Sequence, residues 1–235
     1  RLRLPVTDPL LTTWTACATP NSVTTFPPSV ATTTDLFPWL NTPEWNTVDV
    51  AFRKDVKTIE KISAATGIEP RLLVSVAMVE QLRLYFTQRE VFKRFFEPLK
   101  VLGNATQFAW GVMAIKEATA IDIERHLQDA HSPWYLGSAY EHVLDYPAGA
   151  NQNKERFARL TNERDHSWSY LYGSLELLQF QRQWKRAQHP IDDRPEILAT
   201  LFNIGFGRSH PSDHPSVGGS TLTIANTKYT FGALA

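Results

Sequence analysis

LLVSVAMVEQLRLYF, residues 72–86, is the stretch that decides how this chain is expected to fold. Seven of the eight residues from Leu72 to Val79 are apolar, and Glu80 follows without a break. A segment that is apolar on nearly every side predicts a buried, central helix. Two explanations of Glu80 then remain open: either the helix leaves the core there, or the core holds the carboxyl group in a dry environment.

A dry environment would change the acid–base chemistry of Glu80. Desolvation disfavours the charged carboxylate and would raise the pKa of Glu80. The negative end of the helix dipole acts in the same direction if the helix ends soon after this residue. A carboxyl group that stays protonated near neutral pH is what a general acid for glycosidic bond cleavage requires.

Helix signals surround this segment. Thr42 and Pro43 predict the start of a preceding helix, and Gly67 predicts its end. Pro70 opens the central helix itself, which is expected from residue 71 to about residue 84. The preceding helix carries apolar residues at steps of four, four, three and three, which form one stripe: Val48, Phe52, Val56, Ile59 and Ile62.

Further helices are expected over about residues 89–102, 116–128 and 167–186. The last two are joined by residues 131–168, which are rich in His, Trp and Tyr. These patterns predict a mainly α fold.

The C-terminal part adds one helix and one hairpin. The stretch "DDRPEILATLFNIG" predicts a helix that is capped by Asp192 or Asp193 and ends at Gly205. The alternation in "STLTIANTKYTF" predicts a short β-hairpin that turns near Asn226.

Composition divides the chain into a leader and one domain. Residues 12–34 are rich in Thr and Pro and show no helical or strand period, so residues 1–41 are expected to form an extended leader or tether. Residues 42–235 can bury one substantial core. Because the chain begins with Arg1 rather than Met, we expect it to be a fragment or a mature form.

Charge and cysteine content narrow the classes of partner. The formal net charge is zero and the sequence pI is about 7.2, which argues against nucleic acid as a partner. No apolar run reaches the roughly 20 residues that span a bilayer. The one cysteine, Cys17, excludes an internal disulfide, and it has no basic neighbour that would activate it as a nucleophile.

Three stretches in a fixed order resemble the lysozyme-like lytic transglycosylases and goose-type lysozymes, the glycoside hydrolase family 23-like enzymes of bacterial cell walls. They are "GIEPRLLVSVAMVEQ" (67–81), "WGVMAIKEATA" (110–120) and "ATLFNIG" (199–205), and residues 170–184 look like the long helix that precedes the last motif. The resemblance covers about residues 45–205. The matching positions are Gly67, Pro70, Glu80, Gly111, Met113, Ile115, Thr119, Ala120, Asn203 and Gly205.

The chain also departs from the family pattern at four positions. Gln81 stands where the family usually has serine, Ala114 where it has glutamine, Glu117 where it has proline, and Phe202 where it has tyrosine. The acid and the asparagine of the motifs are kept, so the departures bear on sugar specificity more than on the type of reaction.

The resemblance implies a lysozyme-like helical domain with Glu80 as its catalytic residue. In the single-acid mechanism of the family, this carboxyl protonates the glycosidic oxygen and then, as a carboxylate, deprotonates the C6 hydroxyl of N-acetylmuramic acid. A 1,6-anhydro ring closes by intramolecular attack, so no positioned water is needed. The implied substrate-binding residues are Gly111, Met113, Phe202, Asn203 and Tyr229.

Several of these assignments have an alternative. Asn203 would orient the acetamido group of the substrate, or it caps a helix beside Gly205, or both. Met113 would line the sugar groove or belong to the core. Tyr229 matches a tyrosine that closes the family's active site only if the hairpin permits that alignment.

A hydrolase would need a second carboxylate that activates water. Glu117 and Asp213 are the candidates, although Glu117 also suits the first turn of the 116–128 helix. His210, Asp213 and His214 are ligand types for zinc, but the loop that carries them lacks a clear fourth ligand and is better read as a groove wall or lid.

The functional expectation is therefore cleavage of peptidoglycan glycan strands between N-acetylmuramic acid and N-acetylglucosamine. The alternatives are a lysozyme-type hydrolase on the same fold and a non-catalytic domain that binds the cell wall. The resemblance implies a bacterial protein outside the cytoplasm, in the periplasm or secreted. We expect no cofactor, no metal and a monomer.

Overall fold

The computed structural model describes residues 42–87, 110–224 and 227–235, and it is mainly α, as predicted. The expected helix over residues 89–102 and the expected leader over residues 1–41, with Cys17, lie outside the described residues. The elements are α2 (Pro43–Thr66), α3 (Pro70–Thr87), α5 (Glu117–Gln128), η3 (Ser138–Tyr140), α6 (Gln152–Leu160), α7 (Ser167–Arg186), α8 (Pro195–Ile204), η4 (Phe206–Arg208), β1 (Thr221–Ile224), β2 (Thr227–Thr230) and α9 (Phe231–Leu234).

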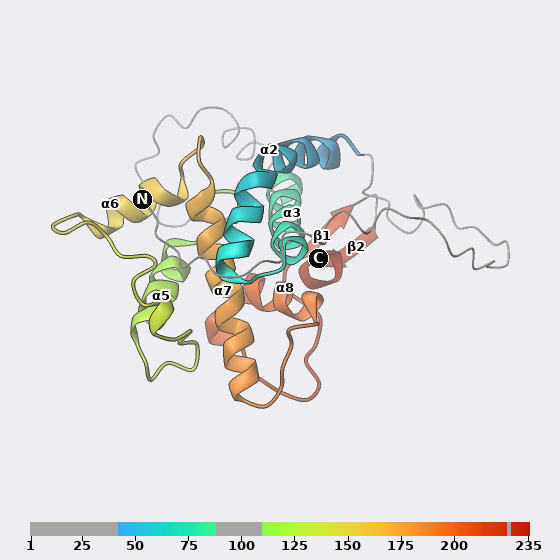
Figure 1. Cartoon of the computed structure of the whole chain (residues 1–235). Coiled ribbons are helices and arrows are strands. Elements are labelled where there is room, and N and C mark those ends of the chain that lie inside the picture. Colours follow the sequence, from blue (N-terminus) through green and yellow to red (C-terminus); the bar gives the residue numbers. More distant parts are fainter. Residues whose placement is uncertain (1–41, 88–109, 225–226) are drawn as a thin grey trace, which may run out of the picture.

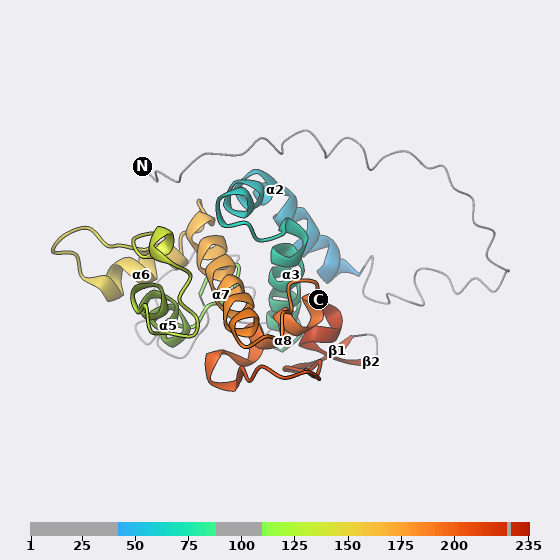
Figure 2. The same ribbon diagram turned by 60° about the horizontal axis from the view of Figure 1, so that its bottom comes forward.

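Helix α7 runs through the middle of the fold, with α5 and α6 on one side and α3 and the β-hairpin on the other (Figure 1 and Figure 2). It contacts α2, α3, α5, α6 and α8. Tyr170, Tyr172 and Phe180 are fully buried on it. Since most of its side chains are inside, α7 is the helix against which the others are organised.

Helix α2 begins and ends where the sequence predicts. The hydroxyl of Thr42 accepts a hydrogen bond from the backbone nitrogen of Trp45, and Pro43 occupies the first turn. Gly67 ends the helix with a φ of 81°, a conformation that favours glycine.

The apolar stripe of α2 is correct except at one turn. Val48, Phe52, Ile59 and Ile62 are buried, but Val56 is exposed. Asp55 faces α7 in its place, where its carboxylate accepts hydrogen bonds from the Tyr170 hydroxyl and pairs with the His166 ring. The polar contact between two helices displaces the apolar stripe at this point.

One predicted helix cap is wrong, and one helix was not predicted. The N-cap of α8 is Arg194 rather than Asp192 or Asp193, and Pro195 is the first helical residue. Helix α6 falls inside the 131–168 region for which no helix was predicted. Its start is fixed by the Asn151 side chain, which accepts a hydrogen bond from a backbone nitrogen of the first turn.

The predicted hairpin is present. Strands β1 and β2 pair antiparallel, with Leu222 opposite Tyr229. Leu222 and Ile224 point inward and are buried, so β1 packs against α3. The turn near Asn226 lies outside the described residues. No helix in the described parts of the chain is long and apolar enough to cross a membrane.

Candidate active site

Glu80 lies inside the fold rather than at its surface. It is on α3, directly after the apolar run, and only 4 % of it is exposed. Of the two explanations that the sequence leaves open, the structure therefore supports the dry environment.

Among the described residues, two polar side chains contact the Glu80 carboxyl group. Arg83, one turn further along α3, donates to Oε2 from Nη2 at 2.5 Å and from Nε at 3.0 Å. Asn203 of α8 places its Nδ2 at 3.5 Å from Oε1, at the limit of hydrogen-bond distance. The structure thus brings together two of the predicted site residues that are far apart in the sequence.

Burial raises the pKa of Glu80 above its ordinary value, and the opposing effects of Arg83 and Asn203 do not cancel it. The helix dipole is not a cause. Helix α3 continues to Thr87, about two turns beyond Glu80, whereas the dipole effect is confined to the last turn. The predicted direction of the shift is right, but it has a single cause.

The loop from Trp110 to Ile115 forms a tight turn beside α3 and α7. Trp110 and Ile115 exchange two backbone hydrogen bonds, and inside the turn Gly111 and Ala114 both have positive φ. Gln81 donates from Nε2 to the backbone oxygen of Val112 at 2.7 Å, which ties this loop to the residue next to Glu80.

Gly111 is required where it stands. A Cβ atom there would lie 2.3 Å from the backbone oxygen of Leu160 and 2.6 Å from the Ser169 hydroxyl. We expect Gly111→Ala to lower the free energy of unfolding by about 2 kcal/mol or more, because positive φ and a backbone clash both oppose it. Urea unfolding measures this, and Gly207→Ala, where the added carbon meets open space, is the control. Equal stability of the two variants would contradict the expectation.

Of three further predicted substrate-binding residues, two are buried and one is partly buried. Met113 is fully buried, and its side chain fills the space beside Gly173 of α7, so it is a core residue, one of the two roles left open. Phe202 is also buried. Tyr229 lies on β2 and packs partly against the core.

Asn203 holds two parts of the fold together. Its Oδ1 accepts a hydrogen bond from the backbone nitrogen of Ser220 at 2.7 Å, just before β1, while its Nδ2 faces Glu80. The amide is therefore oriented by the loop that leads into the hairpin. An oriented amide beside an acid is suited to binding a polar group of a substrate.

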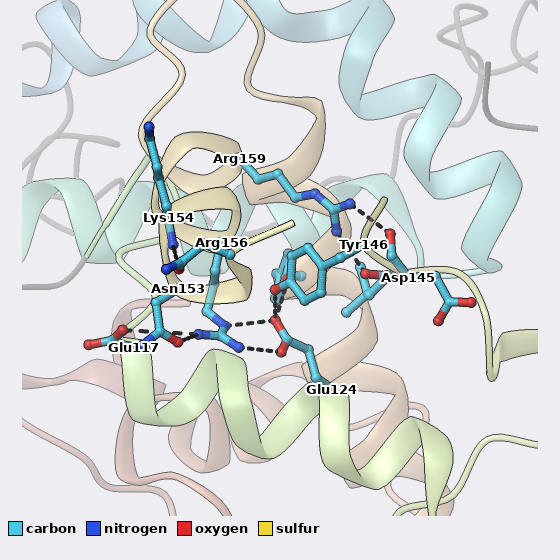
Figure 3. Close-up of polar contacts among 11 residues, drawn as sticks. Glu117, Glu124, Asp145, Tyr146, Asn153, Lys154, Arg156 and Arg159 are labelled. Atoms are coloured by element: carbon cyan, nitrogen blue, oxygen red, sulfur yellow. Dashed lines mark hydrogen bonds and ion pairs between the residues drawn. The ribbon is translucent and has the colours of Figure 1, made fainter. Parts of the chain in front are cut away.

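Glu117 is paired with an arginine of another helix, Arg156. It lies in the first turn of α5, 4.0 Å from Nη1 of the buried Arg156 of α6 (Figure 3). Arg156 also binds both oxygens of Glu124 at 2.8 and 2.7 Å, and the hydroxyls of Tyr146 and Tyr172 donate to the same carboxylate. This cluster fixes α5 against α6 and α7, and Glu117 belongs to it.

Asp213 lies at the surface and contacts a histidine. Its side chain is 81 % exposed and lies 3.1 Å from the His189 ring. His210 and His214 are exposed on the same loop. Among residues 42–87, 110–224 and 227–235, no three His, Cys, Asp or Glu side chains are grouped so that they could hold a metal ion.

A cavity of about 670 Å³ lies beside α5 and the chain that leads from it into α6, and Glu124, Tyr146 and Arg156 are part of its lining. Glu80, Met113 and Asn203 are not. Of the residues that the resemblance implies for the site, Asn203 approaches Glu80, whereas Met113 is buried beside Gly173.

Two charged residues at the site were missed by sequence reasoning. Arg83 was read only as part of the segment that follows the apolar run, although its spacing of three from Glu80 predicts a contact on a helix. Glu176, in the middle of the buried helix α7, is 1 % exposed and interacts electrostatically with Glu80. Its signal was an acid within the apolar stretch "SLELLQF".

No protein-family model matches the chain, and comparisons with curated proteins and with solved structures give no match either.

Proposed function

We propose that this protein cleaves the glycan strands of peptidoglycan as a lytic transglycosylase with a lysozyme-like helical fold. The observation that carries the proposal is the buried Glu80 carboxyl with Asn203 at 3.5 Å, brought together from two motifs in the order that the family resemblance predicts. A bacterial, extracytoplasmic location and peptidoglycan as partner are parts of the same proposal.

The environment of Glu80 suits an acid that later acts as a base. Burial keeps its proton bound to a higher pH than that of an ordinary glutamate, so it can protonate the glycosidic oxygen. The resulting carboxylate then takes the proton of the C6 hydroxyl of N-acetylmuramic acid. Arg83 is placed to stabilise that carboxylate between the two steps.

The arrangement favours intramolecular attack over hydrolysis in which Glu117 or Asp213 activates a water molecule. Glu117 is paired within the Arg156 cluster, and Asp213 is exposed beside His189. Neither is described in contact with Glu80. Intramolecular attack needs no second base, since the nucleophile is already part of the substrate.

The test is the mass of the products formed from purified peptidoglycan in heavy-oxygen water. Ends formed by the transglycosylase are 1,6-anhydro-muramic acid, lighter by one water than hydrolysed ends, and carry no label. Glu117→Gln and Asp213→Asn should give the same products. Labelled reducing ends that disappear in either variant would overturn the proposal in favour of a lysozyme, and no cleavage of any glycan would favour a binding domain.

A further inference from the structure

Glu176 is a buried acid that pairs with no cation among the residues that the structure describes. It lies on α7, is 1 % exposed, and its Oε1 has no hydrogen-bond partner among the residues that the structure describes. An unpaired charge in such a place is costly, so a buried carboxyl of this kind is expected to hold its proton.

By its spacing, Glu176 shares a face of α7 with two residues that contact the loop of residues 110–115. Gly173, three residues earlier on the same helix face, contacts the side chain of Met113, and Ser169 accepts a hydrogen bond from the Met113 backbone nitrogen. The same loop is bound by Gln81, the neighbour of Glu80. Helices α3 and α7 also contact each other directly.

The carboxyl groups of Glu176 and Glu80 have neighbours of opposite charge. Glu176 is influenced by Glu80 and by Asp122 of α5, both acidic, and burial together with these charges raises its pKa well above the ordinary value. Glu80 is influenced by Arg83 and Lys116, both basic. Three other charged groups on elements packed against α7 have partners of their own: Asp55 with His166, Arg156 with Glu124, and Glu196 with Arg194.

We propose that Glu176 is a positioning residue of the Glu80 site and that the two carboxyl groups share a single proton over the neutral pH range. One proton on two interacting acids leaves the pair with one negative charge, and Arg83 supplies the matching positive charge. Without substrate, the proton is mainly on Glu176 and the charge is on Glu80.

The role of the pair in catalysis rests on the proposed function. In the form that reacts, the shared proton is on Glu80 and the charge on Glu176. Glu80 transfers the proton to the glycosidic oxygen as the bond to C1 breaks, and the Glu80 carboxylate then faces the positive charge that develops at C1. The Glu80 carboxylate takes the proton of the C6 hydroxyl, so the pair holds one proton before and after the reaction.

The first test measures the protons directly and needs no activity. Glutamate labelled with carbon-13 at the side-chain carboxyl is titrated by nuclear magnetic resonance, with assignments from Glu80→Gln and Glu176→Gln. We expect each of the two resonances to show two titration steps in the unaltered protein and one step when the other acid is replaced. Independent single steps, unchanged by either substitution, would overturn the proposal even if the protein cleaves glycan.

The second test is the pH profile of kcat/KM. In Glu176→Gln, Glu80 titrates alone beside Arg83, so we expect the alkaline limb to move down by at least one pH unit, about a tenfold loss of activity at a pH on that limb. A merely structural role would lower activity by one factor at every pH and leave the limb in place. Glu196→Gln, an acid already paired on α8, is the control and should leave the profile unchanged.

Discussion

Replacing Glu80 with glutamine is expected to abolish glycan cleavage, with a loss of about a thousandfold or more in kcat/KM. Glutamine has nearly the same shape and can still accept a hydrogen bond from Arg83, but it cannot donate a proton to the glycosidic oxygen. The measurement is the rate of release of soluble fragments from purified peptidoglycan.

The fold should survive this substitution. A neutral amide in a buried position avoids the desolvation that raises the pKa of Glu80, and this offsets the lost ion pair. We expect the unfolding temperature to change by no more than about 4 °C, which corresponds to roughly 1 kcal/mol for a domain of this size. Glu196→Gln should remain fully active. A folded Glu80→Gln protein with normal activity would refute the assignment of Glu80.

Local signals in the sequence were sufficient for the first two helices. A cap at Thr42, a proline after it and a glycine at Gly67 define α2, because each satisfies a geometric need of a helix end. The apolar run before Glu80 predicted a buried α3 because a helix that is apolar on all sides has no face to turn toward water.

Tertiary contacts explain what the sequence did not predict. Val56 matched the apolar period but is exposed, because Asp55 is held on α7 by His166 and Tyr170, residues more than a hundred positions away. Helix α6 is strongly charged, so it lacked the apolar run that identified the others, although the cap at Asn151 was available as a signal.

At the candidate site, too, some features could be predicted from the sequence and others depend on tertiary contacts. The resemblance implied that Asn203 and Glu80 serve one site, and the structure brings their side chains to 3.5 Å. The expectation that Glu117 could serve the site could not take account of Arg156, which lies on a helix that was not predicted. Glu176 carried the same signal as Glu80, an acid inside an apolar run, and it is the more buried of the two.

The largest expected effect on stability belongs to Arg156 in the cluster beside α5. Its side chain is 3 % exposed and binds both oxygens of the Glu124 carboxylate. Arg156→Leu keeps an apolar side chain of fair size but leaves that carboxylate inside the fold without its cation. We expect a loss of about 3–5 kcal/mol in the free energy of unfolding at pH 7, the usual consequence of removing one partner of a buried ion pair. Urea unfolding is the measurement.

The pH dependence separates the lost ion pair from lost packing. Burial raises the pKa of Glu124, but hydrogen bonds from Arg156 and from two tyrosines, together with the charge of Arg156, hold it below its ordinary value. A lowered pKa in the folded state stabilises the protein above the unfolded pKa, about 4.3 for glutamate, and that stability disappears as the pH falls through the folded value. In Arg156→Leu the pKa of Glu124 should rise, so the difference between the two proteins should shrink as the pH falls below about 4. A loss that is equal at pH 7 and pH 3 would show that packing, not charge, is the cause. Arg125→Leu removes an exposed partner of Asp122 and should cost less than about 1 kcal/mol.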